Sequence, residues 1–182
     1  SRTITSSVTL VPQPGCDFDE KCASLVGVWQ GPDPTGPIDW NSNPRQLIFD
    51  DSSWLTPIAA ITETYWTDPA NLGADWVAIT TTAQTDPNYT FYRQAFCTPL
   101  NAGGLNGILE LANDDIGDIY LNGVYVGQKI GSGAADTFPA TGIESGINIL
   151  AIRVLNNSHG GHPPFGQDQN GLIFNLGASY GN

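Results

Sequence analysis

Aromatic side chains outside regular strand patterns are the residues of this sequence best suited to ligand chemistry. The chain has 182 residues with five Trp and six Tyr, and the candidates are Trp40, Tyr65, Trp66 and Trp76. A flat ring offers apolar area to the C–H face of a sugar, while nearby Asn and Asp side chains hydrogen-bond its hydroxyl groups. We therefore expect these four residues to form a carbohydrate-binding platform. The alternative is that each of them closes one end of a hydrophobic core.

Acidic side chains form the second group of candidates. Asp17 and Asp19 alternate along one short segment, and hard oxygen ligands in loops are what Ca²⁺ prefers. We take them as candidate Ca²⁺ ligands, although no EF-hand pattern surrounds them. Nothing in the sequence places two carboxylates on opposite sides of a glycosidic bond, and no nucleophilic-serine or phosphate-loop motif occurs. The sequence therefore predicts a protein that is not an enzyme.

The charge balance restricts the kinds of partner. Six basic residues stand against 18 acidic ones, which gives a net charge of −12 at pH 7. Nucleic acid and anionic membrane surfaces both need Lys and Arg, so neither is an expected partner. No apolar stretch approaches the ~20 residues that span a bilayer. The predicted partner is a glycan, and the acidity otherwise indicates solubility or bound Ca²⁺.

Three cysteines and two N-glycosylation sequons give information about the cellular compartment of the protein. Cys16 and Cys22 lie six residues apart, and we predict a disulfide between them with Cys97 reduced. A bridge from Cys97 to either of the other two, or three free thiols, are the alternatives. The sequons place candidate glycans on Asn88 and Asn156. Together with a first residue other than Met, these features predict an extracellular or cell-surface protein whose signal peptide has been removed.

Short strands are the elements that must hold these residues. The chain has 21 Gly and 13 Pro, which are spread along its length and separate short segments. Almost no segment has apolar residues at a helical period. This pattern predicts an all-β fold, an antiparallel β-sandwich with two sheets of about four strands each. Asn122-Gly123 stands between apolar alternations at 119–121 and 124–126, which predicts a hairpin with a type I′ turn. Ile119 and Leu121 should share one face, with Val124 and Val126 as a matching row.

Several segments together resemble the galactose-binding-like jelly-roll superfamily, whose domains accompany many glycoside hydrolases and lectins. The resemblance covers roughly residues 49–176 and implies a jelly-roll sandwich that binds sugar. In that family the Asp-Asp before the hairpin is a turn feature, and the carboxylates of glycosidase chemistry belong to a separate barrel. The segments that carry the resemblance are Phe49–Trp54 (Asp-Asp-Ser-x-Trp), Tyr89–Phe96, Asn113–Gly127 with its Tyr-Leu-Asn-Gly, Gly146–Val154 (Gly-x-Asn-x-Leu-Ala-x-x-Val) and Asn170–Phe174.

Two function hypotheses follow for a chain divided into an N-terminal strand or arm, 1–14, and one sandwich domain, 15–182. The first is a non-catalytic extracellular carbohydrate-binding module, with or without the assistance of Ca²⁺. The second is a structural subunit of an extracellular filament or surface assembly. In that case the β-prone residues 1–11 would form a homopolymer by adding a strand to the sheet of a neighbouring copy. An accessory domain cut from a larger hydrolase is a third possibility.

Overall fold

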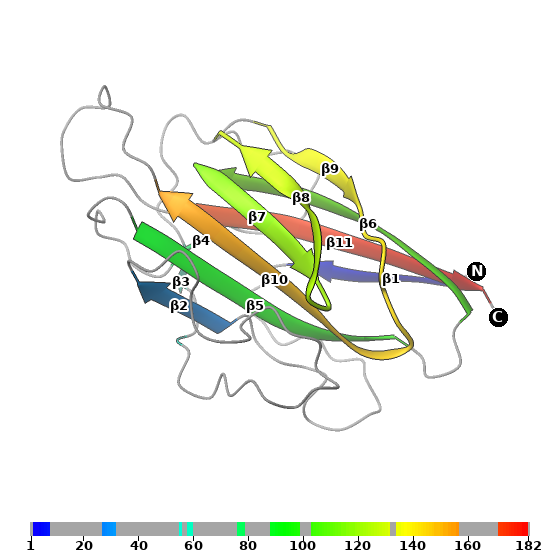
Figure 1. Cartoon of the computed structure of the whole chain (residues 1–182). Coiled ribbons are helices and arrows are strands. Elements are labelled where there is room, and N and C mark those ends of the chain that lie inside the picture. Colours follow the sequence, from blue (N-terminus) through cyan, green and yellow to red (C-terminus); the bar gives the residue numbers. More distant parts are fainter. Residues whose placement is uncertain are drawn as a thin grey trace.

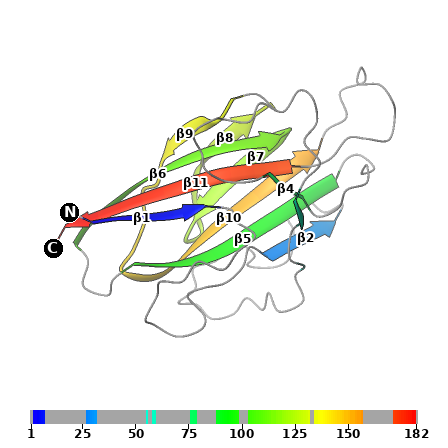
Figure 2. The same cartoon turned by 180° about the vertical axis from the view of Figure 1, so that it is seen from behind.

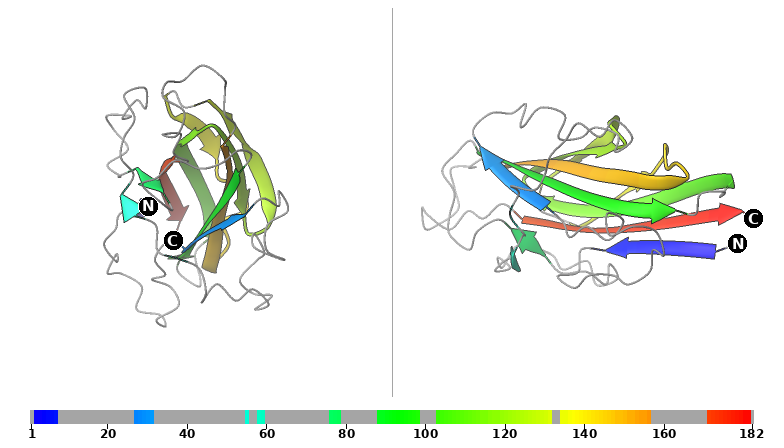
Figure 3. Two further views of the ribbon diagram at one scale, coloured as in Figure 1. Left: turned by 90° about the vertical axis from the view of Figure 1, so that its left-hand side faces the viewer. Right: turned by 90° about the horizontal axis from the view of Figure 1, so that it is seen from below.

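The computed structural model describes residues 2–7, 27–31, 55, 58–59, 76–78, 88–98, 103–131, 134–156 and 171–181. These residues form the predicted all-β sandwich, whose two layers are seen edge-on in Figure 3. No helix in the described ranges could cross a membrane. The strands are β1 (Arg2–Ser7), β2 (Gly27–Gly31), β3 (Ile58–Ala59), β4 (Val77–Ala78), β5 (Asn88–Thr98), β6 (Gly103–Asp114), β7 (Ile116–Leu121), β8 (Val124–Ile130), β9 (Asp136–Pro139), β10 (Gly146–Asn156) and β11 (Gly171–Gly181).

The two sheets have six and five strands (Figure 1). The six-stranded sheet has the order β3-β4-β11-β6-β9, with β1 also paired to β11, and the five-stranded sheet has the order β2-β5-β10-β7-β8. The sheets exceed the expected four or so strands through the short strands β2, β3, β4 and β9, which contain five, two, two and four residues. Strands this short carry too little alternation to be seen in a sequence.

The first strand pairs with the last strand of the same chain. β1 runs antiparallel to β11, from Arg2 opposite Tyr180 to Ser7 opposite Asn175. Both ends of the chain therefore lie side by side at one end of the sandwich (Figures 1 and 2). Within this chain, residues 2–7 act as an additional strand of their own sheet.

The predicted hairpin is present between β7 and β8. Asn122 and Gly123 have φ of 51° and 82°, the left-handed region that a type I′ turn requires at both positions. A register shift between Ile119 and Tyr120 places one extra residue in β8. Val126 consequently packs against the core while Val124 is exposed. The prediction that both valines line the core face with Ile119 and Leu121 is therefore confirmed for Val126 and wrong for Val124.

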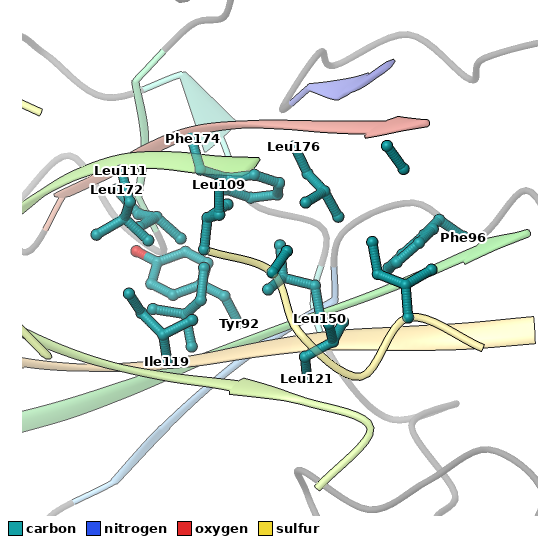
Figure 4. Packing of buried hydrophobic residues seen from close by; sticks show 14 of the residues in the cluster. Tyr92, Phe96, Leu109, Leu111, Ile119, Leu121, Leu150, Leu172, Phe174 and Leu176 are labelled. Carbon is teal, nitrogen blue, oxygen red and sulfur yellow. The ribbon is translucent and has the colours of Figure 1, made fainter. Parts of the chain in front are cut away.

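The core lies between the sheets and is built from alternate residues of the central strands (Figure 4). Tyr92 of β5 is fully buried, and its hydroxyl donates to the carbonyl of Val77 at 3.5 Å. Burial raises the pKa of Tyr92 far above its ordinary value, so the phenol remains neutral. Each buried large side chain stabilises the fold by about 1.5–3 kcal/mol. The labelled members of this cluster are Tyr92, Phe96, Leu109, Leu111, Ile119, Leu121, Leu150, Leu172, Phe174 and Leu176.

Two asparagines join the hairpin turn to the connection between β9 and β10. The amide of Asn122 donates to Asn148 Oδ1 at 2.8 Å and to the carbonyl of Gly142 at 2.9 Å. Its Oδ1 accepts from the backbone N–H of Ile149 at 2.8 Å. Asn148 Oδ1 also accepts from the backbone N–H of Glu144 at 2.7 Å. The two motif segments that contain these asparagines are therefore one structural unit.

Candidate functional site

Of the four aromatic residues expected to form the platform, only Trp76 lies among the described residues. Trp76, immediately before β4, is only 4% exposed. Its ring cannot stack on a ligand from solvent, so its assignment as a binding residue was wrong and the core alternative applies. Trp40, Tyr65 and Trp66 lie outside the described residues.

The acidic candidates fall into two classes. Asp17 and Asp19 lie outside the described residues, and the described ranges contain no group of three or more His, Cys, Asp or Glu side chains arranged to hold a metal ion. Asp115 occupies the bend between β6 and β7. Its backbone N–H donates to the carbonyl of Leu155 at 3.1 Å and its carbonyl accepts from Gly131 N–H at 2.7 Å. This residue is a turn feature, as the resemblance implied.

Cys97, near the end of β5, is disulfide-bonded. The prediction that Cys97 is reduced was therefore wrong. The chain has three cysteines, and the other two, Cys16 and Cys22, lie outside the described residues.

The two sequon asparagines stand opposite each other, Asn88 of β5 against Asn156 of β10. Asn156 is fully buried, and a glycan on its amide would need space outside the fold. Its assignment as a glycosylation site was therefore wrong for the folded protein. The side chain of Asn88 lies outside the described part of the structure.

The outer face of the five-stranded sheet combines polar and aromatic side chains. Side chains alternate between the two faces of a strand, so the core residues Ile119 and Ile152 alternate with outward-facing Asp118, Tyr120 and Arg153. In the cross-strand register, Asp118 stands between Gln128 of β8 and Arg153 of β10. We call this surface the outer-sheet site, defined by Tyr89, Asp118, Tyr120, Tyr125, Gln128 and Arg153.

The carboxylate of Asp118 is the centre of the outer-sheet site, and both of its oxygens accept hydrogen bonds. Arg153 Nη2 lies 2.5 Å from Asp118 Oδ2, and Arg153 Nε donates to the same oxygen at 3.1 Å. Gln128 Nε2 donates to Asp118 Oδ1 at 2.8 Å. Hydrogen bonds to a carboxylate fix its position. The three side chains therefore form a rigid polar row across strands β8, β7 and β10.

Tyrosine rings flank this polar row. Tyr120 and Tyr125 meet edge to face with centroids 5.5 Å apart and an interplanar angle of 66°. The guanidinium carbon of Arg153 lies 5.7 Å from the centroid of Tyr89, which is cation–π geometry. Tyr125 is 54% exposed, and its ring is the part of the site open to a ligand.

A buried apolar cluster and the hydroxyl group of Tyr125 are the remaining parts of this surface. Phe91, Ile149 and Ala151 form a buried cluster on this face, and Tyr89 and Tyr120 pack against it. Desolvation and then the charge of Asp118 raise the pKa of Tyr125, with Tyr120 acting in the same direction and Arg153 opposing them. The Tyr125 hydroxyl therefore stays protonated at neutral pH and can both donate and accept a hydrogen bond.

The arrangement suits recognition of a polyhydroxylated ligand. A flat exposed ring provides apolar area, and the Gln128 amide and the Tyr125 hydroxyl provide directed hydrogen bonds. Sequence reasoning missed this site because it looked for aromatics in loops. The strand alternation of the hairpin could have indicated this site. If Ile119 and Leu121 face the core, then Asp118 and Tyr120 must face outward.

Comparison with known proteins shows the fold. No family model and no curated protein sequence matches the chain. A solved β-glucuronidase of Bacteroides uniformis is similar, with a TM-score of 0.58 and 20% identity over 97% of this chain. A β-glucuronidase from glycoside hydrolase family 2 has a TM-score of 0.54 and 16% identity over 97%. A putative β-galactosidase from Bacteroides fragilis has a TM-score of 0.51 and 15% identity over 96%.

The chain spans only 18%, 18% and 23% of the length of these three structures. Identities at this level show a shared β-sandwich and no shared residue roles. The chain therefore has a fold that also occurs as one part of much longer glycoside hydrolase chains.

Proposed function

We propose that this chain is a non-catalytic carbohydrate-binding module whose binding surface is the outer-sheet site. The observation that carries the proposal is the exposed ring of Tyr125 beside the hydrogen-bonded polar row of Gln128, Asp118 and Arg153. The shared fold with parts of β-glucuronidases and a putative β-galactosidase supports a carbohydrate-related role.

In this proposal the sugar ring packs on Tyr125, and the sugar hydroxyl groups bond to the Gln128 amide and the Tyr125 hydroxyl. Gln128 is exposed, and its amide has a second N–H and an acceptor oxygen besides its bond to Asp118. Because Asp118 already holds Gln128 and Arg153 in place, little side-chain entropy is lost when the ligand binds. The row crosses three neighbouring strands, so an extended glycan would lie across the strands.

We also propose an extracellular location and an optional role for Ca²⁺. The disulfide at Cys97 supports an oxidising compartment. The Ca²⁺ proposal rests on Asp17 and Asp19 alone, so glycan binding should be compared in CaCl₂ and in EDTA. Pairing of β1 within its own chain favours the module over the alternative of a filament joined through residues 1–11. Mass in solution before and after deletion of these residues tests that alternative.

Replacing Tyr125 by Ala is expected to weaken glycan binding by about 1–3 kcal/mol, which is roughly a 5- to 150-fold rise in Kd. The physical reason is the loss of the exposed ring that packs on the sugar. Titration calorimetry with a glycan identified on an array gives the measurement. The fold should be unaffected because Tyr125 lies on an edge strand and is largely exposed.

Ile108→Ala is the matched control, because Ile108 is 57% exposed but belongs to the other sheet. It should leave the glycan affinity unchanged. An array without signal in both CaCl₂ and EDTA would contradict the proposed function. Equal losses of affinity in the two variants would contradict the placement of the site.

A further inference from the structure

We propose that the outer-sheet site selects uncharged glycans and rejects glycans that carry uronate groups, and that Asp118 imposes this selectivity. The inference rests on the proposed function and names the class of ligand. It depends on three observations: the engagement of Arg153, the engagement of the other described cations, and the neutral character of the groups left to meet a ligand.

The cation within the site is already neutralised. A carboxylate on a sugar is usually recognised by the planar fork of a guanidinium, through two parallel N–H donors. In Arg153 the Nε and Nη2 edge is directed to Asp118 Oδ2. A uronate would have to displace Asp118 from that edge or lie beside its negative charge. Either route costs binding free energy that an uncharged sugar does not lose.

The remaining described cations offer no substitute. The Lys129 ammonium is buried and donates to the carbonyls of Ile130 and Gly131 at 3.0 and 2.9 Å. Arg93 is buried as well, and Arg2 lies on β1 of the other sheet. The chain has six basic residues against 18 acidic ones, so its overall field also repels polyanions.

The groups left to contact a ligand are neutral. Among the described residues of the site, these are the aromatic face and hydroxyl of the exposed Tyr125 and the amide of the exposed Gln128. Such groups bond to sugar hydroxyls without requiring a charge on the ligand. They therefore fit neutral hexose chains and give no advantage to an acidic chain of the same shape.

Replacement of Asp118 by Asn tests the proposal by gain of binding. The wild-type protein should bind neutral gluco- or galacto-oligosaccharides at least tenfold more tightly than an oligogalacturonate of equal length. Asp118→Asn keeps the shape of the side chain but removes the negative charge beside the Arg153 guanidinium. We expect the variant to bind the oligogalacturonate at least tenfold more tightly than wild type does, and this gain should fall as salt is raised.

Glu110→Gln is the matched control. Glu110 lies on β6 of the other sheet, where it alternates with the core residues Leu109 and Leu111, and its replacement changes the net charge by the same single unit. It should leave the ratio of neutral to uronate binding at the wild-type value. A gain of uronate binding equal to that of Asp118→Asn would show a general charge effect and overturn the assignment to Asp118.

Two further outcomes separate this inference from the proposed function. Wild-type protein that binds oligogalacturonate as tightly as neutral chains overturns the inference and leaves the proposed function standing. Wild-type protein that binds neither class overturns the proposed function and the inference with it. Because the wild-type ratio and its salt dependence are measured on the native chain, the proposal stays testable even if Asp118→Asn is poorly folded.

Discussion

Replacing Asn148 by Ala is expected to lower the free energy of unfolding by about 4 kcal/mol, from about 1 kcal/mol for each lost hydrogen bond. Its side chain is fully buried and makes four bonds. Oδ1 accepts from Asn122 Nδ2 and from Glu144 N–H at 2.8 and 2.7 Å. Nδ2 donates to the carbonyls of Glu144 and Gly146 at 2.8 and 3.0 Å. These four bonds use the full capacity of the amide, and truncation leaves buried groups without partners.

Urea unfolding followed by fluorescence measures the loss, with Asn106→Ala as the control. Asn106 makes one exposed bond, from its Nδ2 to the carbonyl of Gly104 at 3.1 Å, so its removal should cost less than about 1 kcal/mol. A loss below about 1 kcal/mol for Asn148→Ala would contradict the role of this side chain as the link between the two connections.

Replacing Asn148 by Asp is expected to make the difference in folding stability from wild type depend on pH. A carboxylate at this position would face the carbonyls of Glu144 and Gly146, which disfavours its charged form and raises its pKa in the folded state. The folded state then binds more protons than the unfolded state, so the stability of Asn148→Asp should increase relative to wild type as pH falls. A difference between the two proteins that is independent of pH would contradict this arrangement.

Removal of the Cys97 disulfide is the second large expected effect. A bridge from Cys97 to either Cys16 or Cys22 closes a loop of more than 70 residues, for which loop entropy predicts a stabilisation of about 4 kcal/mol. Cys97→Ala should therefore lower the melting temperature by about 10 °C in a chain of this size. Reduction of the wild-type protein should produce a similar shift and should leave the variant unchanged.

The single variants Cys16→Ala and Cys22→Ala provide the matched comparison. Loss of the true partner should reproduce the shift of Cys97→Ala, while loss of the other cysteine should be nearly neutral. Mass spectrometry of peptides from the non-reduced protein identifies the same partner independently. A crosslinked peptide that joins Cys16 to Cys22 would contradict the bridge at Cys97.

Local rules were sufficient to predict the hairpin. Asn122-Gly123 specifies its turn by a backbone requirement that few residue pairs meet, and the structure confirms it. The motif asparagine of β10 was recognised as part of a pattern, but its reason is non-local. Asn148 bonds to Asn122, 26 residues earlier in the chain, and no periodicity in a single strand shows such a contact.

The candidate site could not be predicted because it depends on which strands are neighbours. Asp118 meets Gln128 through a local hairpin, but Arg153 reaches it only because β10 lies beside β7. The sequence indicates that Asp118 and Arg153 face outward on their own strands and does not indicate that they meet. Cys97 was misassigned for the same reason, since short spacing favoured the pair Cys16 and Cys22 while the fold engages the distant Cys97.

The pairing of β1 with β11 has a consequence for how this fold can be combined with other proteins. Arg2 stands opposite Tyr180, so a polypeptide enters and leaves the sandwich at nearly the same point (Figure 1). Folds with adjacent ends tolerate insertion into a surface loop of a host and circular permutation. A short linker from residue 182 to residue 1, with new ends opened at the exposed Gly123, should give a permuted sandwich with the same sheet order. A sandwich with adjacent ends can therefore be carried within a host protein as readily as at its end.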